Sequence, residues 1–168
     1  MLTCKISSKN LELLKAWNIP VLFVDCLPPE AGAEYTCVTS DNFAASRALG
    51  EHFAALGYRR WAFVGHAPNW NTRAPRQQGF EAAAAECGAS IEIAEGGNDA
   101  EVARRALMLM LTAASADRRP QAIFASNTVL LKGALGALKD LGLKAPQQVA
   151  IAAFDDFDWA ELVDPRSP

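Results

Sequence analysis

Short apolar segments alternate with longer amphipathic segments along the chain. Parallel strands covered on both faces are apolar nearly throughout, and such strands separated by helices are typical of α/β proteins. A further extended segment is expected over residues 35–41. The apolar runs that fit the strand pattern are 20–25, 61–65, 90–96, 121–127 and 149–156. The pattern therefore predicts an α/β fold with a parallel sheet and flanking helices.

Four helices are predicted between the strands. A residue suited to cap a helix stands before the first and the third of them, and a glycine follows the first, the second and the fourth. The helices are expected at residues 42–56, 75–87, 100–113 and 128–141. On the third helix, the side chains expected to face the core are Val102, Ala106, Leu109, Met110 and Ala113.

A polar residue or pair of residues stands at the carboxyl end of each predicted strand. Taken singly, each is better explained by capping of the turn that follows the strand. Ligands bind beyond the carboxyl ends of the strands in open parallel sheets, so five such ends on one edge favour a ligand site. The residues are Asp25, His66, Asn98, Ser126, Asn127, Asp155 and Asp156.

The sequence lacks the motifs of several kinds of chemistry. It has no GxSxG nucleophile turn, no GxxxxGK[ST] phosphate loop, no GxGxxG after the first strand and no clustered metal ligands. We therefore predict no enzyme activity, no cofactor and no metal. The remaining groups are carboxylates, an amide and an arginine, with Trp70 or Trp159 available to cover an apolar sugar face. This inventory suits a neutral polyhydroxylated ligand.

Composition narrows the class of protein further. A hydrophobic fraction of 51% in 168 residues can form a core, and the net charge of -3 offers no basic surface for nucleic acid. The apolar runs are too short to cross a bilayer, and the first residues lack the apolar segment of a secretion signal. The four cysteines lack metal-site spacing and are expected to be reduced. We expect a cytoplasmic protein with no membrane partner and no nucleic-acid binding of its own.

Several longer stretches are similar to a known family. They are VTSDNFAASRALGEHFAALGYRRWAFVG, the R-x-x-G-F of residues 76–80, and QAIFASN followed by LLKGALGALKDLGL and VAIAAFDD. Together they resemble the effector-binding domain of LacI/GalR-family bacterial transcriptional repressors, over residues 18–165. The resemblance implies a periplasmic-binding-protein-like fold with two α/β lobes, a sugar or similar metabolite between the lobes, and a homodimer.

The resemblance also implies which residues touch the effector, a sugar or sugar phosphate. Arg76 and Asp155 would hold adjacent hydroxyls, and Asn127 would orient them. Asp156 would fix local backbone geometry instead. The other positions that match ligand-contacting positions of the family are Asp25, Thr72 and, by a weaker alignment, Asn98.

The chain departs from the family pattern at both ends. It shows neither the helix-turn-helix and hinge helix of family members nor the segment that returns to build the rest of the amino-terminal lobe. We interpret residues 1–39 as a remnant of the amino-terminal lobe, 40–157 as a nearly complete carboxy-terminal lobe, and 158–168 as the truncated start of the crossover back. DNA would be bound only through the missing helix-turn-helix.

Two other classes of protein remain open. A periplasmic-type sugar-binding protein would share the fold, although the absent signal segment and the FDD and R-x-x-G-F residues favour the repressor. A small α/β enzyme would need a nucleophile and base pair, which the sequence does not offer.

Overall fold

The computed structural model describes residues 6–28, 35–66 and 73–156. The chain divides into two compact units, Met1–Asn42 and Phe43–Pro168. Each unit has its own parallel sheet and its own apolar core. None of the helices formed by these residues has the length and apolar character needed to span a membrane.

The described residues of the first unit form one helix and two short parallel strands. The helix α1 (Ser8–Ala16) begins after Ser7, whose side chain accepts a hydrogen bond from the backbone N–H of Asn10. The strands β1 (Leu22–Val24) and β2 (Thr36–Val38) pair along their whole length. The buried apolar side chains of this unit are Leu11, Phe23 and Cys26. This core is small compared with that of the second unit.

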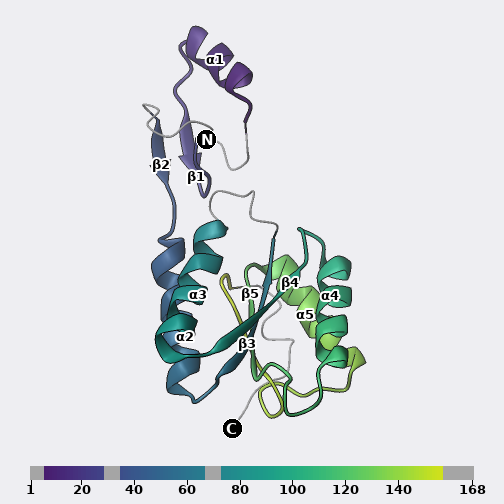
Figure 1. The fold of residues 1–168 in the computed structure, drawn as a ribbon. Helices are drawn as coiled ribbons and strands as arrows, with labels where there is room; N and C mark the ends of the chain where they lie inside the picture. The colour runs from purple at the N-terminus through teal and green to yellow at the C-terminus, as the bar shows by residue number, and fades with distance from the viewer. Residues whose placement is uncertain (1–5, 29–34, 67–72, 157–168) are drawn as a thin grey trace. The chain divides into compact units, whose positions relative to one another are not determined.

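The second unit contains a four-stranded parallel sheet in the order β4-β3-β5-β6. Helices α2 and α3 cover one face of the sheet, and α4 and α5 cover the other (Figure 1). The predicted fold class, an α/β fold with a parallel sheet and flanking helices, is confirmed. The strands are β3 (Arg60–Gly65), β4 (Ser90–Glu95), β5 (Ala122–Ala125) and β6 (Ala150–Ala153). The helices are α2 (Asn42–Ala55), α3 (Ala74–Cys87), α4 (Ala100–Ala113) and α5 (Thr128–Asp140).

Alternate residues of the central strands pack on the two faces of this sheet. On β3, Trp61 and Phe63 join an aromatic cluster with α2 and α3, whereas Ala62 and Val64 join an aliphatic cluster with α4 and α5. The ring of Phe80 on α3 lies within the aromatic cluster, with its centroid 5.0 Å from that of Trp61. Both faces of β3 are therefore buried, which explains its uninterrupted apolar run in the sequence.

The two helices on each face approach closely at a glycine. A side chain at Gly79 of α3 would overlap the backbone carbonyl oxygen of Phe43 on α2. A side chain at Gly133 of α5 would likewise overlap the carbonyl oxygen of Ala100 on α4. Such backbone contacts set the distance between the two axes of a helix pair. Each face of the sheet is therefore covered by a pair of helices with a fixed spacing.

The helix boundaries agree with the sequence predictions to within one residue, but two burial predictions were wrong. The buried residues of α4 are Ala103, Leu107 and Leu111, whereas Val102 and Leu109, predicted to face the core, are 40% and 71% exposed. Because α4 is apolar over most of its circumference, its periodicity does not identify the inward stripe. The strand β4, predicted to be covered on both faces, lies at one edge of the sheet and is partly exposed.

Candidate functional site

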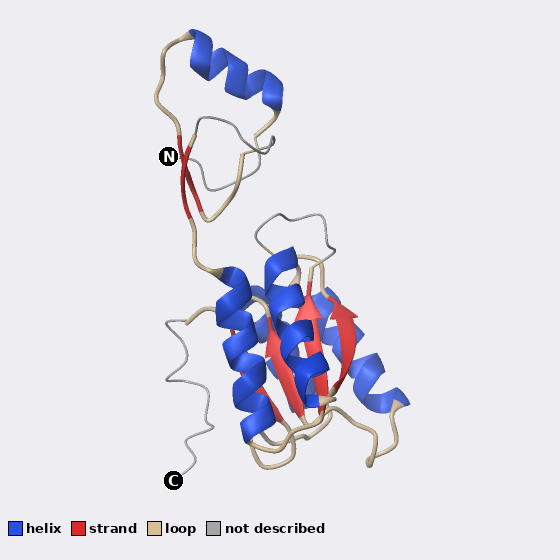
Figure 2. Cartoon of the chain, turned by 60° about the vertical axis from the view of Figure 1, so that its left-hand side comes forward, coloured by secondary structure: helices blue, strands red, loops and turns tan. Residues whose placement is uncertain are grey.

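The carboxyl ends of the four strands in the second unit meet at one edge of the sheet (Figure 2). From β3 the chain passes through α3 to β4 on one side, and it then crosses to β5 on the other side of β3. In open parallel sheets, a crevice forms where the direction of the connections reverses in this way. His66 follows β3 at this point, and Ser126 and Asn127 follow β5. The ends of these two strands are therefore the centre of the candidate site.

Arg76 is buried in the first turn of α3, with 4% of its surface exposed. Its Nη1 donates a hydrogen bond of 2.6 Å to the backbone carbonyl oxygen of Ser126 and lies 3.6 Å from Oδ2 of Asp155. Its guanidinium carbon lies 3.5 Å from the centroid of the Phe154 ring. A buried charge is costly unless it has such partners. Arg76 therefore joins α3 to the ends of β5 and β6.

Asp155 is the accessible partner in this arrangement, because 45% of its side chain is exposed. Its carboxylate can accept hydrogen bonds from a ligand while the charge of Arg76 offsets its own. The hydroxyl of Ser126, the residue whose backbone carbonyl accepts from Arg76, is buried and has no hydrogen-bond partner among the described residues. Arg76 and Asp155, which the sequence resemblance assigns to one ligand, are thus adjacent in the structure.

Asn127 connects three elements of the site. Its Oδ1 accepts a hydrogen bond of 2.8 Å from the backbone N–H of Leu130, which caps α5 and fixes the orientation of the amide. Nδ2 donates to Nε2 of His66 at 3.0 Å and to Oδ1 of Asn98 at 3.3 Å. The structure therefore brings Asn98 and Asn127 together. Both amide protons of Asn127 are used, and one lone pair on Oδ1 is left for a ligand.

His66 is a further polar group of the site, and it is only 7% exposed. Burial, followed by the charges of Arg73 and Arg76, lowers the pKa of His66 to about 4. The imidazole is therefore neutral at physiological pH, so its Nε2 can accept the hydrogen bond from Asn127. The sequence placed His66 at a strand end but not in the ligand set. His66 stands directly after β3, where the direction of the strand connections reverses. That position is the signal that could have added it to the predicted ligand set.

The other two residues assigned to the ligand are Asp25 and Thr72. Asp25 follows β1 in the first unit, where its backbone N–H donates to the carbonyl oxygen of Val38 at 2.9 Å. The prediction that five strand ends share one edge was wrong, because β1 belongs to a separate two-stranded sheet. Thr72 lies outside the described residues, as do Trp70 and Trp159. Among the residues that the structure describes, no three His, Cys, Asp or Glu side chains are grouped to hold a metal ion.

Comparison with known proteins identifies the family. Residues 51–167 match the family of periplasmic binding protein-like domains. The HTH-type transcriptional repressor PurR of Klebsiella pneumoniae (strain 342) is 28% identical over 160 residues, which cover 92% of this chain and 46% of the relative. PurR of Salmonella newport (strain SL254) is 29% identical over the same length. The chain thus spans about half the length of these curated relatives.

Solved structures share the fold. A LacI-family regulatory protein from Chloroflexus aggregans is 26% identical, with a TM-score of 0.80 over 95% of this chain and 57% of that one. A LacI-family regulator from Enterococcus faecium with bound ribose has a TM-score of 0.83 at 21% identity, over 95% of this chain and 59% of that one. The Cra transcriptional dual regulator from Pseudomonas putida, in complex with fructose 1-phosphate, has a TM-score of 0.78 at 20% identity over 95% and 58%.

The family model covers more than half of the chain, and both the curated relatives and the solved structures are regulators of one type. The parallel sheet and the polar groups at its carboxyl edge agree with that relationship. The chain therefore belongs to the periplasmic binding protein-like domains, and it is similar to part of LacI-type transcriptional regulators.

Proposed function

We propose that the carboxyl edge of the second sheet binds a small polyhydroxylated effector, a sugar or sugar phosphate, within a LacI/GalR-type regulator. The observation that carries the proposal is the buried guanidinium of Arg76 beside the half-exposed carboxylate of Asp155. A carboxylate accepts hydrogen bonds from adjacent hydroxyls, and a guanidinium donates in a rigid fork that suits hydroxyl or phosphate oxygens. Ribose and fructose 1-phosphate, bound by two relatives of the same fold, belong to this class of ligand.

Each residue of the site has a separate role in this proposal. Asp155 accepts hydrogen bonds from the effector, and Arg76 holds that carboxylate in place and donates to ligand oxygens. Asn127 positions His66 and Asn98 around the ligand, in agreement with its two donated hydrogen bonds. Asp25 and Thr72 complete the ligand set in the proposal. The role is binding and not catalysis, as for the repressors among the relatives.

Regulation of transcription requires contact with DNA. We assign that contact to a helix-turn-helix segment, because the curated relatives are HTH-type repressors. The acidic net charge of -3 argues against DNA binding by the two units themselves. A cytoplasmic location and a homodimer are further parts of the proposal. A gel shift with the purified chain should therefore show no salt-sensitive binding of DNA.

We further propose that the two units belong to different lobes of the effector-binding domain. The first, within residues 1–39, would be part of the amino-terminal lobe, and residues 40–157 would form the carboxy-terminal lobe, with 158–168 starting the return crossover. The small core of the first unit should make it the less protected part. Hydrogen exchange should be fast across Val21 to Asp25 and slow across Trp61 to Gly65. Equal protection in a monomer would contradict this division of stability.

A ligand screen tests the proposed effector class. Thermal shifts measured with a panel of sugars and sugar phosphates, including ribose and fructose 1-phosphate, should single out a ligand that raises the melting temperature. Calorimetric titration of that ligand should then show binding weakened about 10- to 100-fold by Asp155→Asn, which removes the acceptor charge but keeps the shape of the side chain.

The adjacent carboxylate provides the matched control for this experiment. Asp156→Asn makes the same change of charge one residue along, at an exposed position outside the proposed ligand set. Its affinity for the ligand should remain within about twofold of the parent chain. Equal weakening by both substitutions, or by neither, would remove Asp155 from the site. A panel without any stabilising sugar or sugar phosphate would contradict the proposed ligand class.

A further inference from the structure

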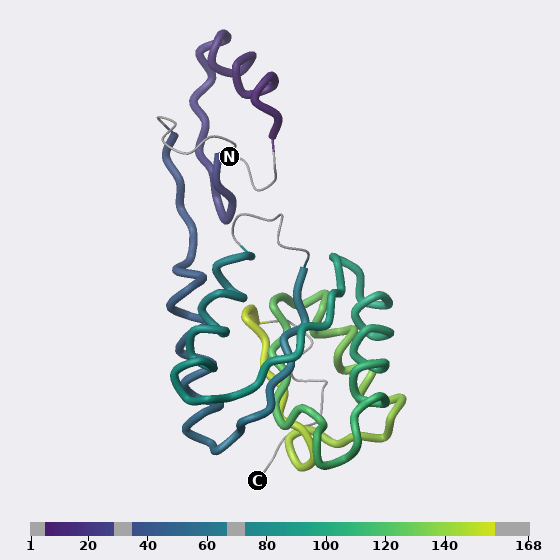
Figure 3. The backbone as a smooth tube through the Cα atoms, in the orientation of Figure 1, coloured from purple at the N-terminus to yellow at the C-terminus, as the bar shows by residue number. Residues whose placement is uncertain are grey.

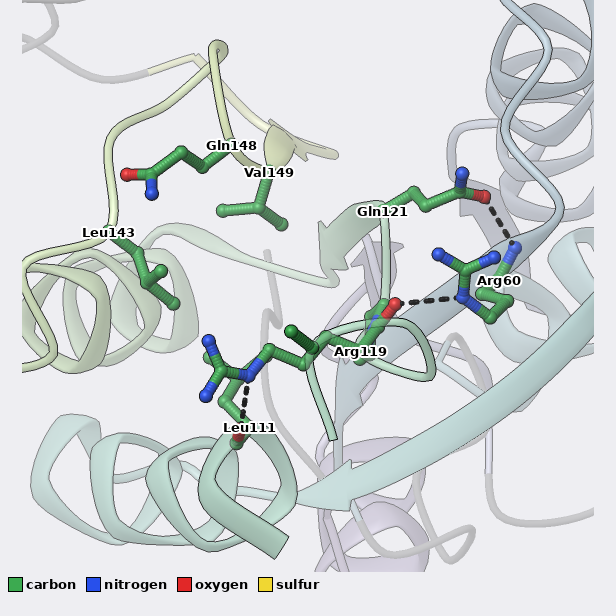
Figure 4. A pocket seen from close by; sticks show the side chains of 9 residues that line it. Arg60, Leu111, Arg119, Gln121, Leu143, Gln148 and Val149 are labelled. Atoms are coloured by element: carbon green, nitrogen blue, oxygen red, sulfur yellow. Dashed lines mark hydrogen bonds between the residues drawn. The ribbon is translucent and has the colours of Figure 1, made fainter. Parts of the chain in front are cut away.

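The second unit has a pocket at the opposite end of its sheet from the candidate effector site. The pocket has a volume of about 270 Å³ and lies where β3, β5 and β6 begin. The connections α4–β5 and α5–β6 lie side by side there and form much of its wall (Figure 3). Its apolar lining includes Leu111, Leu143 and Val149, and four polar side chains line the remainder (Figure 4).

Two of the polar side chains are glutamines whose amides have a fixed orientation. Oε1 of Gln121 accepts hydrogen bonds from the backbone N–H groups of Arg59 at 2.8 Å and Arg60 at 3.1 Å. Oε1 of Gln148 accepts the backbone N–H of Lys144 at 2.8 Å. The oxygen end of each amide is therefore tied to the backbone, which leaves the Nε2 end as the free end. Neither Nε2 group has a hydrogen-bond partner among the described residues.

The other two are arginines, each anchored through Nε. Arg60 Nε donates to the carbonyl oxygen of Arg119 at 3.0 Å, and Arg119 Nε donates to the carbonyl oxygen of Leu111 at 2.9 Å (Figure 4). The Nη groups of both side chains form neither a hydrogen bond nor an ion pair with any residue that the structure describes. Two guanidinium charges thus remain without a carboxylate partner in this part of the chain.

Asp117 is the acidic side chain whose charge interacts with this region. Its pKa is lowered chiefly by a hydrogen bond with the Ser115 side chain, then by its own backbone, and only last by the charge of Arg60. Asp117 is not among the residues that line the pocket. The charges of Asp117 and Arg60 interact without a hydrogen bond or an ion pair between the two side chains in the described structure.

We propose that this pocket binds a small organic anion, in which a carboxylate or phosphate group is attached to a short apolar body. The unused polar groups of the four lining side chains are donors, apart from one lone pair on Oε1 of Gln148, because both amide oxygens and both Nε groups already bond to the backbone. Donors in excess of acceptors, two of them charged, select an anionic oxygen ligand over a hydroxylated neutral one. The leucine and valine side chains accommodate the apolar body.

Titration of the ¹⁵N-labelled chain with isovalerate and, separately, with inorganic phosphate tests this proposal. The Arg Nε–H and Gln Nε2 resonances of the pocket should shift and saturate at millimolar concentrations of anion. Isovaleramide, which keeps the apolar body and loses the charge, should shift them at least tenfold less. Stronger binding of phosphate than of isovalerate would point to a phosphate ligand, and the reverse would point to a carboxylate. Sodium chloride at equal ionic strength corrects for general screening.

A substitution at Gln148 provides the variant for this test. Gln148→Glu keeps an oxygen to accept the Lys144 N–H and replaces the free donor by a negatively charged acceptor, so anion binding should weaken at least tenfold. Gln147→Glu, at the adjacent exposed residue outside the pocket, adds the same charge and should weaken binding no more than twofold. Absence of saturable shifts with both anions, equal response to isovaleramide, or full affinity in Gln148→Glu would overturn the proposal. Shifts confined to Arg76 and Asn127 would overturn it as well.

Discussion

The two ends of the four-stranded sheet use the same kinds of side chain in opposite ways. At the carboxyl end, Arg76 has a carboxylate, a carbonyl oxygen and an aromatic ring as partners, and the amide of Asn127 uses both of its protons. At the amino end, Arg60 and Arg119 each bond through one nitrogen and leave their Nη groups free of described partners. Polar groups satisfied inside the protein stabilise the fold, whereas unsatisfied donors take their acceptors from solvent or from a ligand.

The largest expected difference between the two ends is in stability. Arg76→Met should lower the free energy of unfolding by about 3 kcal/mol, because it leaves the Ser126 carbonyl without its donor and the Asp155 carboxylate without its ion-pair partner. Arg119→Met at the other end should cost only about 1 kcal/mol, the value of one hydrogen bond to the Leu111 carbonyl. Urea denaturation followed by circular dichroism measures both. Losses of equal size would show that the two ends do not differ in this respect.

A smaller loss of stability is expected from substitution of Asn127, whose amide connects three elements at the carboxyl end of the sheet. Asn127→Ala removes the cap of α5 and the donors to His66 and Asn98, and it should cost about 2 kcal/mol in the same urea experiment. Asn127→Asp keeps the oxygen that caps α5 and should recover about half of that loss. A carboxylate beside the imidazole should also raise the pKa of His66 from about 4, which an NMR titration would detect. An unchanged pKa would mean that the two side chains are not in contact.

The smallest of the three effects is a dependence of stability on pH that comes from His66. Its pKa is about 4 in the folded chain and near 6.5 in the unfolded chain, so the unfolded chain binds more protons between these values. The contribution of neutral His66 to the free energy of unfolding is fully present above pH 6.5, and it is lost as the pH falls toward 4. The loss should be on the order of 1 kcal/mol.

Comparison of His66→Asn with the parent chain isolates this contribution from other acid effects. The substitution should abolish the pH-dependent difference, whereas His52→Asn, on the exposed surface of α2, should leave it in place. Similar pH profiles for the parent chain and His66→Asn would contradict the lowered pKa.

Much of the fold could be predicted because its signals are local and periodic. The uninterrupted apolar run of β3 and the glycines that follow three of the helices depend only on neighbouring residues, and the elements predicted from them agree with the structure. The inward stripe of α4 could not be predicted, because Leu109 and Leu107 are equally apolar and only the packing of α4 against α5 and the sheet selects Leu107. The edge position of β4 depends on strand order, which no local pattern specifies.

The candidate site could be predicted in part. Arg76 and Asp155 came from a resemblance to a family, and the structure brings them within ion-pair distance. The ring of Phe154 under Arg76 and the hydrogen bond from Asn127 to His66 were not foreseen, because they join segments far apart in sequence through side chains alone. The amino-end pocket was missed for the same reason. Its glutamines belong to no periodic pattern. Whether each amide offers a donor or an acceptor to the pocket depends on which of its ends is hydrogen-bonded to the backbone.

The glycine contacts between the helices have a consequence for how this protein can change over evolutionary time. Gly79 and Gly133 leave no room for a larger side chain, so substitution there forces a whole helix pair to move. The residues that give each end of the sheet its chemistry lie in loops, at helix starts or, for Arg60, at the start of a strand, outside these contacts. Substitutions that change ligand preference can therefore accumulate at either end of the sheet while the helix pairs between the two ends stay unchanged. Neutral drift should be slow at the two glycines and fast along the loops.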